Sequence, residues 1–103
     1  MKKLNEKIIC KDGFIMSVQA NKGAYCSPRV DDAAVYTAVE VGYPSECEPL
    51  LLEWAEDANI PTDTVYGWVP AARISLVCAK HGGVVSGELP PGIPLLEVDN
   101  ESR

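Results

Sequence analysis

The chain has 103 residues, of which 47% are hydrophobic and 23% charged, and its formal net charge is −6. This length suits one domain with a single core, and the composition excludes a disordered chain, a collagen-like rod and a disulfide-rich miniprotein. No apolar stretch reaches the ~18 residues of a membrane span and no signal peptide is recognised, so we expect a soluble, cytoplasmic protein without membrane contacts.

The charge is divided unevenly along the chain. Residues 1–29 carry a net charge of +4, whereas residues 30–103 carry −10. Nonspecific affinity for DNA comes from clustered Lys and Arg side chains that neutralise phosphates. The acidic part therefore predicts no direct binding to duplex DNA, and it leaves open an acidic surface that mimics nucleic acid or covers a basic protein.

The cysteines do not have the spacing of a metal site. Cys10, Cys26, Cys47 and Cys78 form no Cys-x-x-Cys pair, and the chain has one histidine. We therefore expect no metal and no cofactor. Cytoplasmic thiols stay reduced, so these cysteines are predicted to be small apolar core residues, with Cys26 as the exception.

Two strands joined by a tight turn are predicted at the start of the chain. Residues 3–10 lead through Asp12-Gly13 into the alternating run 14–20, and Asp-Gly is a strong hairpin signal because glycine accepts a positive φ. Residues 21–34 lack periodicity and predict a long loop, where recognition residues often lie. Alternation returns over residues 36–43 and predicts a third strand.

A helix is predicted after this strand. Ser45 and Glu48 have the spacing of a capping box ahead of the apolar run 50–58, in which Trp54 is expected to lie in the core. Residues 59–63 interrupt the periodicity.

The second half of the chain predicts one more strand and one more helix. Residues 64–69 are rich in β-branched and aromatic side chains and predict a strand. Pro70 to His81 predicts a helix that stops at Gly82-Gly83. Residues 84–89 suit an edge strand, and residues 90–94 an extended, polyproline-like segment.

These elements predict an α+β domain with a small, mainly antiparallel sheet covered by two helices. Their order along the chain is strand, strand, strand, helix, strand, helix. The domain is predicted over residues 1–85, and residues 86–103 are predicted to be an extended, proline-rich tail. The helix face at Leu76 and the edge at Val84-Val85 add apolar surface beyond the needs of this core, so we expect a homodimer.

Catalysis has weak support in the sequence. Cys26 could serve as a nucleophile and His81 as its general base, because their side chains are of the kinds used in such catalysis. Packing in the loop is the favoured explanation of Cys26, and capping of a helix end is sufficient to explain His81. We assign no catalytic residue and leave enzymatic activity open.

Aromatic and basic side chains give the stronger signal. Aromatic rings stack on planar groups or hold apolar anchors, and arginine binds phosphate or carboxylate in a bidentate manner. Tyr25 and Arg29 lie in the long loop, and Tyr66 and Trp68 are placed on the same side of the fourth strand. The predicted ligand-binding residues are Tyr25, Cys26, Arg29, Tyr36, Tyr66, Trp68 and Arg73.

Five sequence blocks resemble a known family. They are KDGF-x-MSVQA at residues 11–20, YCSPR at 25–29, YTAVEVGYPS at 36–45, PTDTVYGWVP at 61–70 and AKHGG at 79–83. As a set they resemble short, uncharacterised accessory proteins encoded by tailed phages and prophages of enteric and related bacteria. The resemblance implies no catalytic residue.

Small phage accessory proteins often act on host immunity, so the resemblance implies a counter-defence binding protein in the host bacterial cytoplasm. Its partner would be a host protein that it blocks, or a small anionic ligand such as a nucleotide signal that it sequesters. The alternatives are a small enzyme that depends on Cys26 and a structural or assembly accessory of the phage particle.

Overall fold

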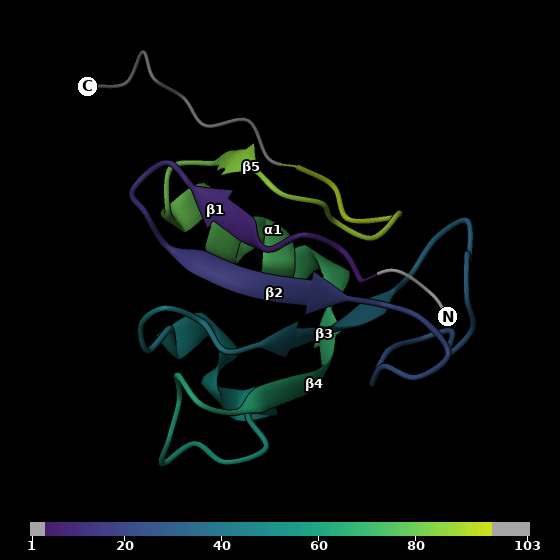
Figure 1. Cartoon of the computed structure of the whole chain (residues 1–103), viewed down its shortest axis with the longest axis horizontal. Helices are drawn as coiled ribbons and strands as arrows, with labels where there is room; N and C mark the ends of the chain where they lie inside the picture. Colours follow the sequence, from purple (N-terminus) through teal and green to yellow (C-terminus); the bar gives the residue numbers. More distant parts are fainter. Residues whose placement is uncertain (1–3, 96–103) are drawn as a thin grey trace.

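The computed structural model describes residues 4–95, which form an antiparallel sheet, one α-helix and one 3-10 helix (Figure 1). The spatial strand order is β4-β3-β2-β1-β5, so the last strand lies beside the first. This arrangement confirms the predicted α+β class. The elements are β1 (Ile8–Cys10), β2 (Ile15–Gln19), β3 (Ala38–Gly42), η1 (Pro49–Trp54), β4 (Val65–Pro70), α1 (Ala71–Lys80) and β5 (Val84–Ser86).

The predicted hairpin is confirmed. β1 and β2 pair in an antiparallel manner, with Ile8 opposite Met16. The Cys10 amide donates to the Phe14 carbonyl at 2.8 Å, and Gly13 has the positive φ of 96° that such a turn favours. The alternate side chains of this run are buried, which directs one face of the hairpin into the core.

The helix predicted from Ser45 to residue 58 is wrong in type and length. Glu48 rather than Ser45 is the N-cap, with its carboxylate accepting from the Leu50 amide at 2.8 Å. The 3-10 helix ends at Trp54 because the chain then pairs with β4, and the Glu56 amide donates to the Val65 carbonyl at 2.9 Å. Trp54 is partly buried against the core rather than inside it.

Helix α1 matches its prediction closely. It begins at Ala71, because Pro70 is still the last residue of β4. At the other end, the Gly83 amide donates to the Cys78 carbonyl at 2.8 Å, and Gly82 has a φ of 89°, which is a glycine-dependent helix stop. α1 lies behind β1 and β2 in Figure 1 and buries Ile74, Ser75, Val77 and Cys78.

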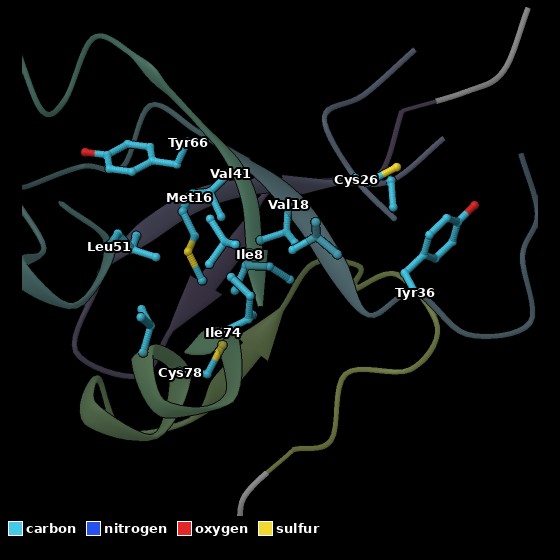
Figure 2. Packing of buried hydrophobic residues seen from close by; sticks show 14 of the residues in the cluster. Ile8, Met16, Val18, Cys26, Tyr36, Val41, Leu51, Tyr66, Ile74 and Cys78 are labelled. Atoms are coloured by element: carbon cyan, nitrogen blue, oxygen red, sulfur yellow. The ribbon is translucent and has the colours of Figure 1, made fainter. Parts of the chain in front are cut away.

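The core lies between the sheet and α1, and it extends into the long loop (Figure 2). Ile8, Met16 and Val18 from the first hairpin meet Ile74 and Cys78 from the helix in this cluster. The further members that Figure 2 labels are Cys26, Tyr36, Val41, Leu51 and Tyr66.

The segment predicted as a tail contacts the domain as far as it is described. β5 crosses the predicted boundary at residue 85. Beyond it, the Tyr36 amide donates to the Pro91 carbonyl at 2.9 Å, and the Ser75 hydroxyl donates to the Pro94 carbonyl. Residues 96–103 of the predicted tail lie outside the described residues. Within residues 4–95, no helix is long and apolar enough to cross a membrane.

Candidate functional site

A bulge in β4 turns one aromatic side chain outward. Val41 pairs with Tyr66 and Val39 with Val69, so two residues of β4 oppose one of β3. The extra residue is taken up at Gly67-Trp68, where Trp68 has a φ of 53°. Tyr66 is consequently buried and Trp68 is 49% exposed. The prediction that the two side chains share one side of the strand is wrong.

The long loop docks on this bulge through Tyr25. The Trp68 amide donates to the Tyr25 carbonyl at 3.0 Å, and the Tyr25 amide donates to the Glu40 carboxylate at 2.9 Å. A Cβ on Gly67 would lie 3.3 Å from the Tyr25 Cβ, so the glycine permits this close approach. The Tyr25 and Trp68 rings stack with centroids 5.0 Å apart and 25° between their planes.

The pairing of the chain after η1 with β4 brings in a second tryptophan. Ala55 lies opposite Tyr66 in an antiparallel bridge, which places Trp54 across from Gly67. The result is an open hollow of about 400 Å³. Its lining residues are Tyr25, Trp54, Glu56, Gly67 and Trp68.

Two arginines accompany the rings. The guanidinium carbon of Arg29 lies 5.2 Å from the Tyr25 ring centroid, and that of Arg73 lies 5.3 Å from the ring of Trp54. Both distances are within the range of cation–π attraction. Neither arginine belongs to the lining of the hollow. We call Tyr25, Arg29, Trp54, Trp68 and Arg73 the aromatic face.

The structure brings Tyr25, Arg29, Trp68 and Arg73 to this face, but it removes the other predicted binding residues from it. Cys26, Tyr36 and Tyr66 are each at most 2% exposed. The hydroxyls of Tyr36 and Tyr66 donate to the carbonyls of Val30 and Pro61, which satisfies them inside the fold. These three side chains are structural, because a partner cannot reach them.

Sequence reasoning missed three residues of the hollow: Trp54, Glu56 and Gly67. Trp54 and Glu56 were assigned to a helix that does not form. A glycine inside a strand pattern often marks a bulge or a close backbone approach, so Gly67 carried a usable signal for the outward turn of Trp68.

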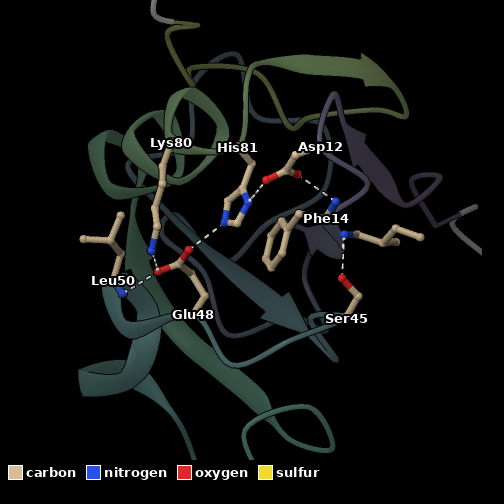
Figure 3. A network of polar contacts seen from close by, with 8 residues as sticks. Asp12, Phe14, Ser45, Glu48, Leu50, Lys80 and His81 are labelled. Atoms are coloured by element: carbon tan, nitrogen blue, oxygen red, sulfur yellow. Dashed lines mark hydrogen bonds and ion pairs between the residues drawn. The ribbon is translucent and has the colours of Figure 1, made fainter.

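A charge network centred on the buried side chains of Glu48 and His81 lies elsewhere, where the β1–β2 turn, the start of η1 and the end of α1 meet (Figure 3). His81 Nδ1 lies 2.6 Å from Asp12 Oδ2, and its Nε2 lies 2.7 Å from Glu48 Oε1. Lys80 Nζ donates to Glu48 Oε2 at 2.9 Å. The His81 ring also stacks on Phe14, with centroids 4.1 Å apart. The network joins three elements that are distant in sequence.

The contacts of the network favour charged forms. Burial alone would lower the pKa of His81, but the hydrogen bonds to Glu48 and Asp12 outweigh it and raise that pKa. Burial likewise opposes the Glu48 carboxylate, yet the Leu50 amide, Lys80 and His81 together lower its pKa. The Phe14 amide, followed by His81, lowers the pKa of Asp12. The two carboxylates therefore favour the imidazolium form of His81 that lies between them.

The structure does not pair Cys26 with His81. The Cys26 thiol is buried and contacts the carbonyls of Asn21 and Pro28. Both ring nitrogens of His81 are occupied by carboxylates, so neither is available to a nucleophile. All four cysteines are free, and the exposed one is Cys47 rather than Cys26.

Among residues 4–95, no group of histidine, cysteine and acidic side chains is arranged to hold a metal ion. Comparisons of the chain with protein families, curated proteins and solved structures find no match.

Proposed function

We propose that the protein acts by binding a partner through the aromatic face. The observation that carries this proposal is the exposed Tyr25–Trp68 stack. Trp68 is half exposed and has a positive φ, and both features lower the free energy of unfolding. Strained residues of this kind are concentrated at functional sites. The main-chain contacts of Tyr25 fix the stack in place before any partner arrives, which lowers the entropic cost of binding.

The resemblance to phage accessory proteins supports a counter-defence role for this binding. The partner is then a host protein that the aromatic face blocks, or a small nucleotide signal that it sequesters. Exposed aromatic rings suit both, since they seat the apolar anchors of a protein and stack on bases. The arginines beside the rings add contacts for carboxylate or phosphate.

The experiment is affinity capture from an infected enteric host, with mass spectrometry of proteins and small molecules, followed by titration of the recovered partner. Tyr25→Ala and Arg29→Ala are each expected to weaken binding by about 1–3 kcal/mol, the range of central interface residues. Ile60→Ala is the control, because Ile60 is 46% exposed and lies outside the aromatic face. Parent-like binding by both folded variants would show that the aromatic face is not the site.

A further inference from the structure

We propose that the hollow beside Trp68 holds an organic cation, namely the guanidinium or ammonium group of an arginine or lysine side chain on a basic segment of a partner protein. This inference rests on the proposed function and selects a protein rather than a nucleotide as the partner.

The lining of the hollow has the chemistry of a cation site. Tyr25, Trp54 and Trp68 supply three aromatic rings, and the faces of such rings carry negative potential. Among the described residues, Glu56 is the one charged member of the lining. A cation in the hollow would therefore meet aromatic rings and a carboxylate, whereas a phosphate there would meet the repulsion of Glu56, and the guanidinium groups of Arg29 and Arg73 stand outside the lining.

Two of these rings already attract guanidinium groups within the chain. Arg29 lies over Tyr25, and Arg73 lies over Trp54. These internal contacts show that the rings hold planar cations at ordinary cation–π distances. Since both arginines stand outside the lining, the hollow itself remains available to a further cation.

The charge around the hollow extends the same preference to a longer segment. Arg29 and Arg73 contact two of the lining rings from outside the hollow, while Glu53 and Asp57 are exposed on either side of Glu56 in the chain. This charge steers a basic segment toward the face and disfavours an anionic one. Gly67 contributes no side chain to the lining, which leaves room for the entering group.

The chain offers a direct readout, because both of its tryptophans line the hollow. We would record the two indole N–H signals by NMR while titrating N-acetyl-arginine N-methylamide into the full chain. N-acetyl-citrulline N-methylamide is the matched neutral probe, since it has nearly the same shape without the charge. Choline represents a free quaternary ammonium compound, and adenosine monophosphate a planar anion.

The arginine probe is expected to shift both indole signals saturably and to bind about tenfold more tightly than the citrulline probe, a factor that corresponds to about 1.4 kcal/mol. Glu56→Gln is expected to weaken the arginine probe by about two- to fivefold, as for an exposed ion pair. Glu46→Gln changes the net charge equally at an exposed position outside the lining and should leave this affinity unchanged.

Three results would overturn the inference. Equal affinity for the arginine and citrulline probes would show that positive charge does not contribute to binding in the hollow. Binding of choline without the arginine probe would make the ligand a free small molecule. Shifts by adenosine monophosphate alone, or by none of the probes, would exclude a cation site. The proposed function would survive any of these results if Tyr25→Ala still lost the captured partner.

Discussion

Two carboxylates contact the imidazole ring of His81, one at each nitrogen. This arrangement makes the stability of the fold depend on pH. In the unfolded chain His81 titrates near 6.5, and in the folded chain its pKa is higher. The stabilisation is therefore complete below pH 6.5 and declines as the pH rises through the folded-state pKa. The pKa values of Glu48 and Asp12 are lowered from 4.5 and 3.8, so their contribution is lost as the pH falls.

We predict a maximum in the free energy of unfolding between pH 4.5 and 6.5, bounded by the ordinary pKa values of Glu48 and His81. Urea unfolding from about pH 3 to about pH 9 measures it. His81→Gln should cost about 2–4 kcal/mol near the maximum, because buried Glu48 loses a charged partner. The same variant should lose most of the alkaline decline, and an unchanged decline would contradict the assignment to His81.

Single residues of the aromatic face were partly predictable. Tyr25 and Arg29 could be chosen because aromatic and basic side chains in a long, aperiodic loop have few structural duties. Residue type alone does not distinguish the buried Tyr36 and Tyr66 from an exposed tyrosine such as Tyr25. Their hydroxyls are satisfied by carbonyl groups that only the folded chain brings close. His81 was expected to cap a helix, because Asp12 and Glu48 reach it only through tertiary contacts.

At the scale of elements, sequence patterns predicted correctly those elements that are formed by contacts between residues close together in the chain. The first hairpin and α1 follow from alternation, a turn glycine and helix stops, which act within a few residues. The helix predicted across residues 45–58 failed because its apolar spacing competes with pairing to β4. The Glu56–Val65 hydrogen bond and the burial of Glu48 favour the observed structure over the predicted helix. Both are tertiary features that cannot be inferred from a short stretch of sequence.

The attachment of β5 depends on Gly87, and this gives a prediction with an internal control. Gly87 has a φ of 107°, and a Cβ there would lie 2.2 Å from the Lys7 carbonyl oxygen. Gly13 has a φ of 96°, but its Cβ would meet nothing within 4 Å. Gly13→Ala should therefore cost about 1–2 kcal/mol through backbone strain alone.

Gly87→Ala should cost at least about 1–3 kcal/mol more than Gly13→Ala, because the clash with the chain before β1 adds to the strain. Urea unfolding compares the two variants, and hydrogen exchange should show faster exchange at the β1–β5 amides in Gly87→Ala. Equal costs for the two substitutions would refute the close packing of Gly87.

At the scale of the whole molecule, the expected homodimer stays a prediction. Leu76 is 45% exposed and Val85 is 62% exposed, and β5 lies at one end of the sheet. An edge strand with an exposed apolar side chain can pair with a second copy. Light scattering at micromolar concentration should report twice the 11.1 kDa of one chain.

Val85→Lys should return the protein to a single chain, because a charge at the edge opposes pairing. Ile60→Lys is the control, since Ile60 is 46% exposed in a turn far along the chain from β5. A mass of 11.1 kDa for the parent would reject the dimer.

The pairing of β5 with β1 also determines when the chain can fold during its synthesis on a ribosome. Ile9 pairs with Ile15 on one side but with Ser86 on the other, and Asp12 meets His81 across 69 positions. A nascent chain can form its first hairpin early, yet Ile8 and Met16 stay uncovered until α1 has emerged. Folding is thus completed only after α1 and β5 have emerged, and until then the exposed apolar strands are a target for chaperones.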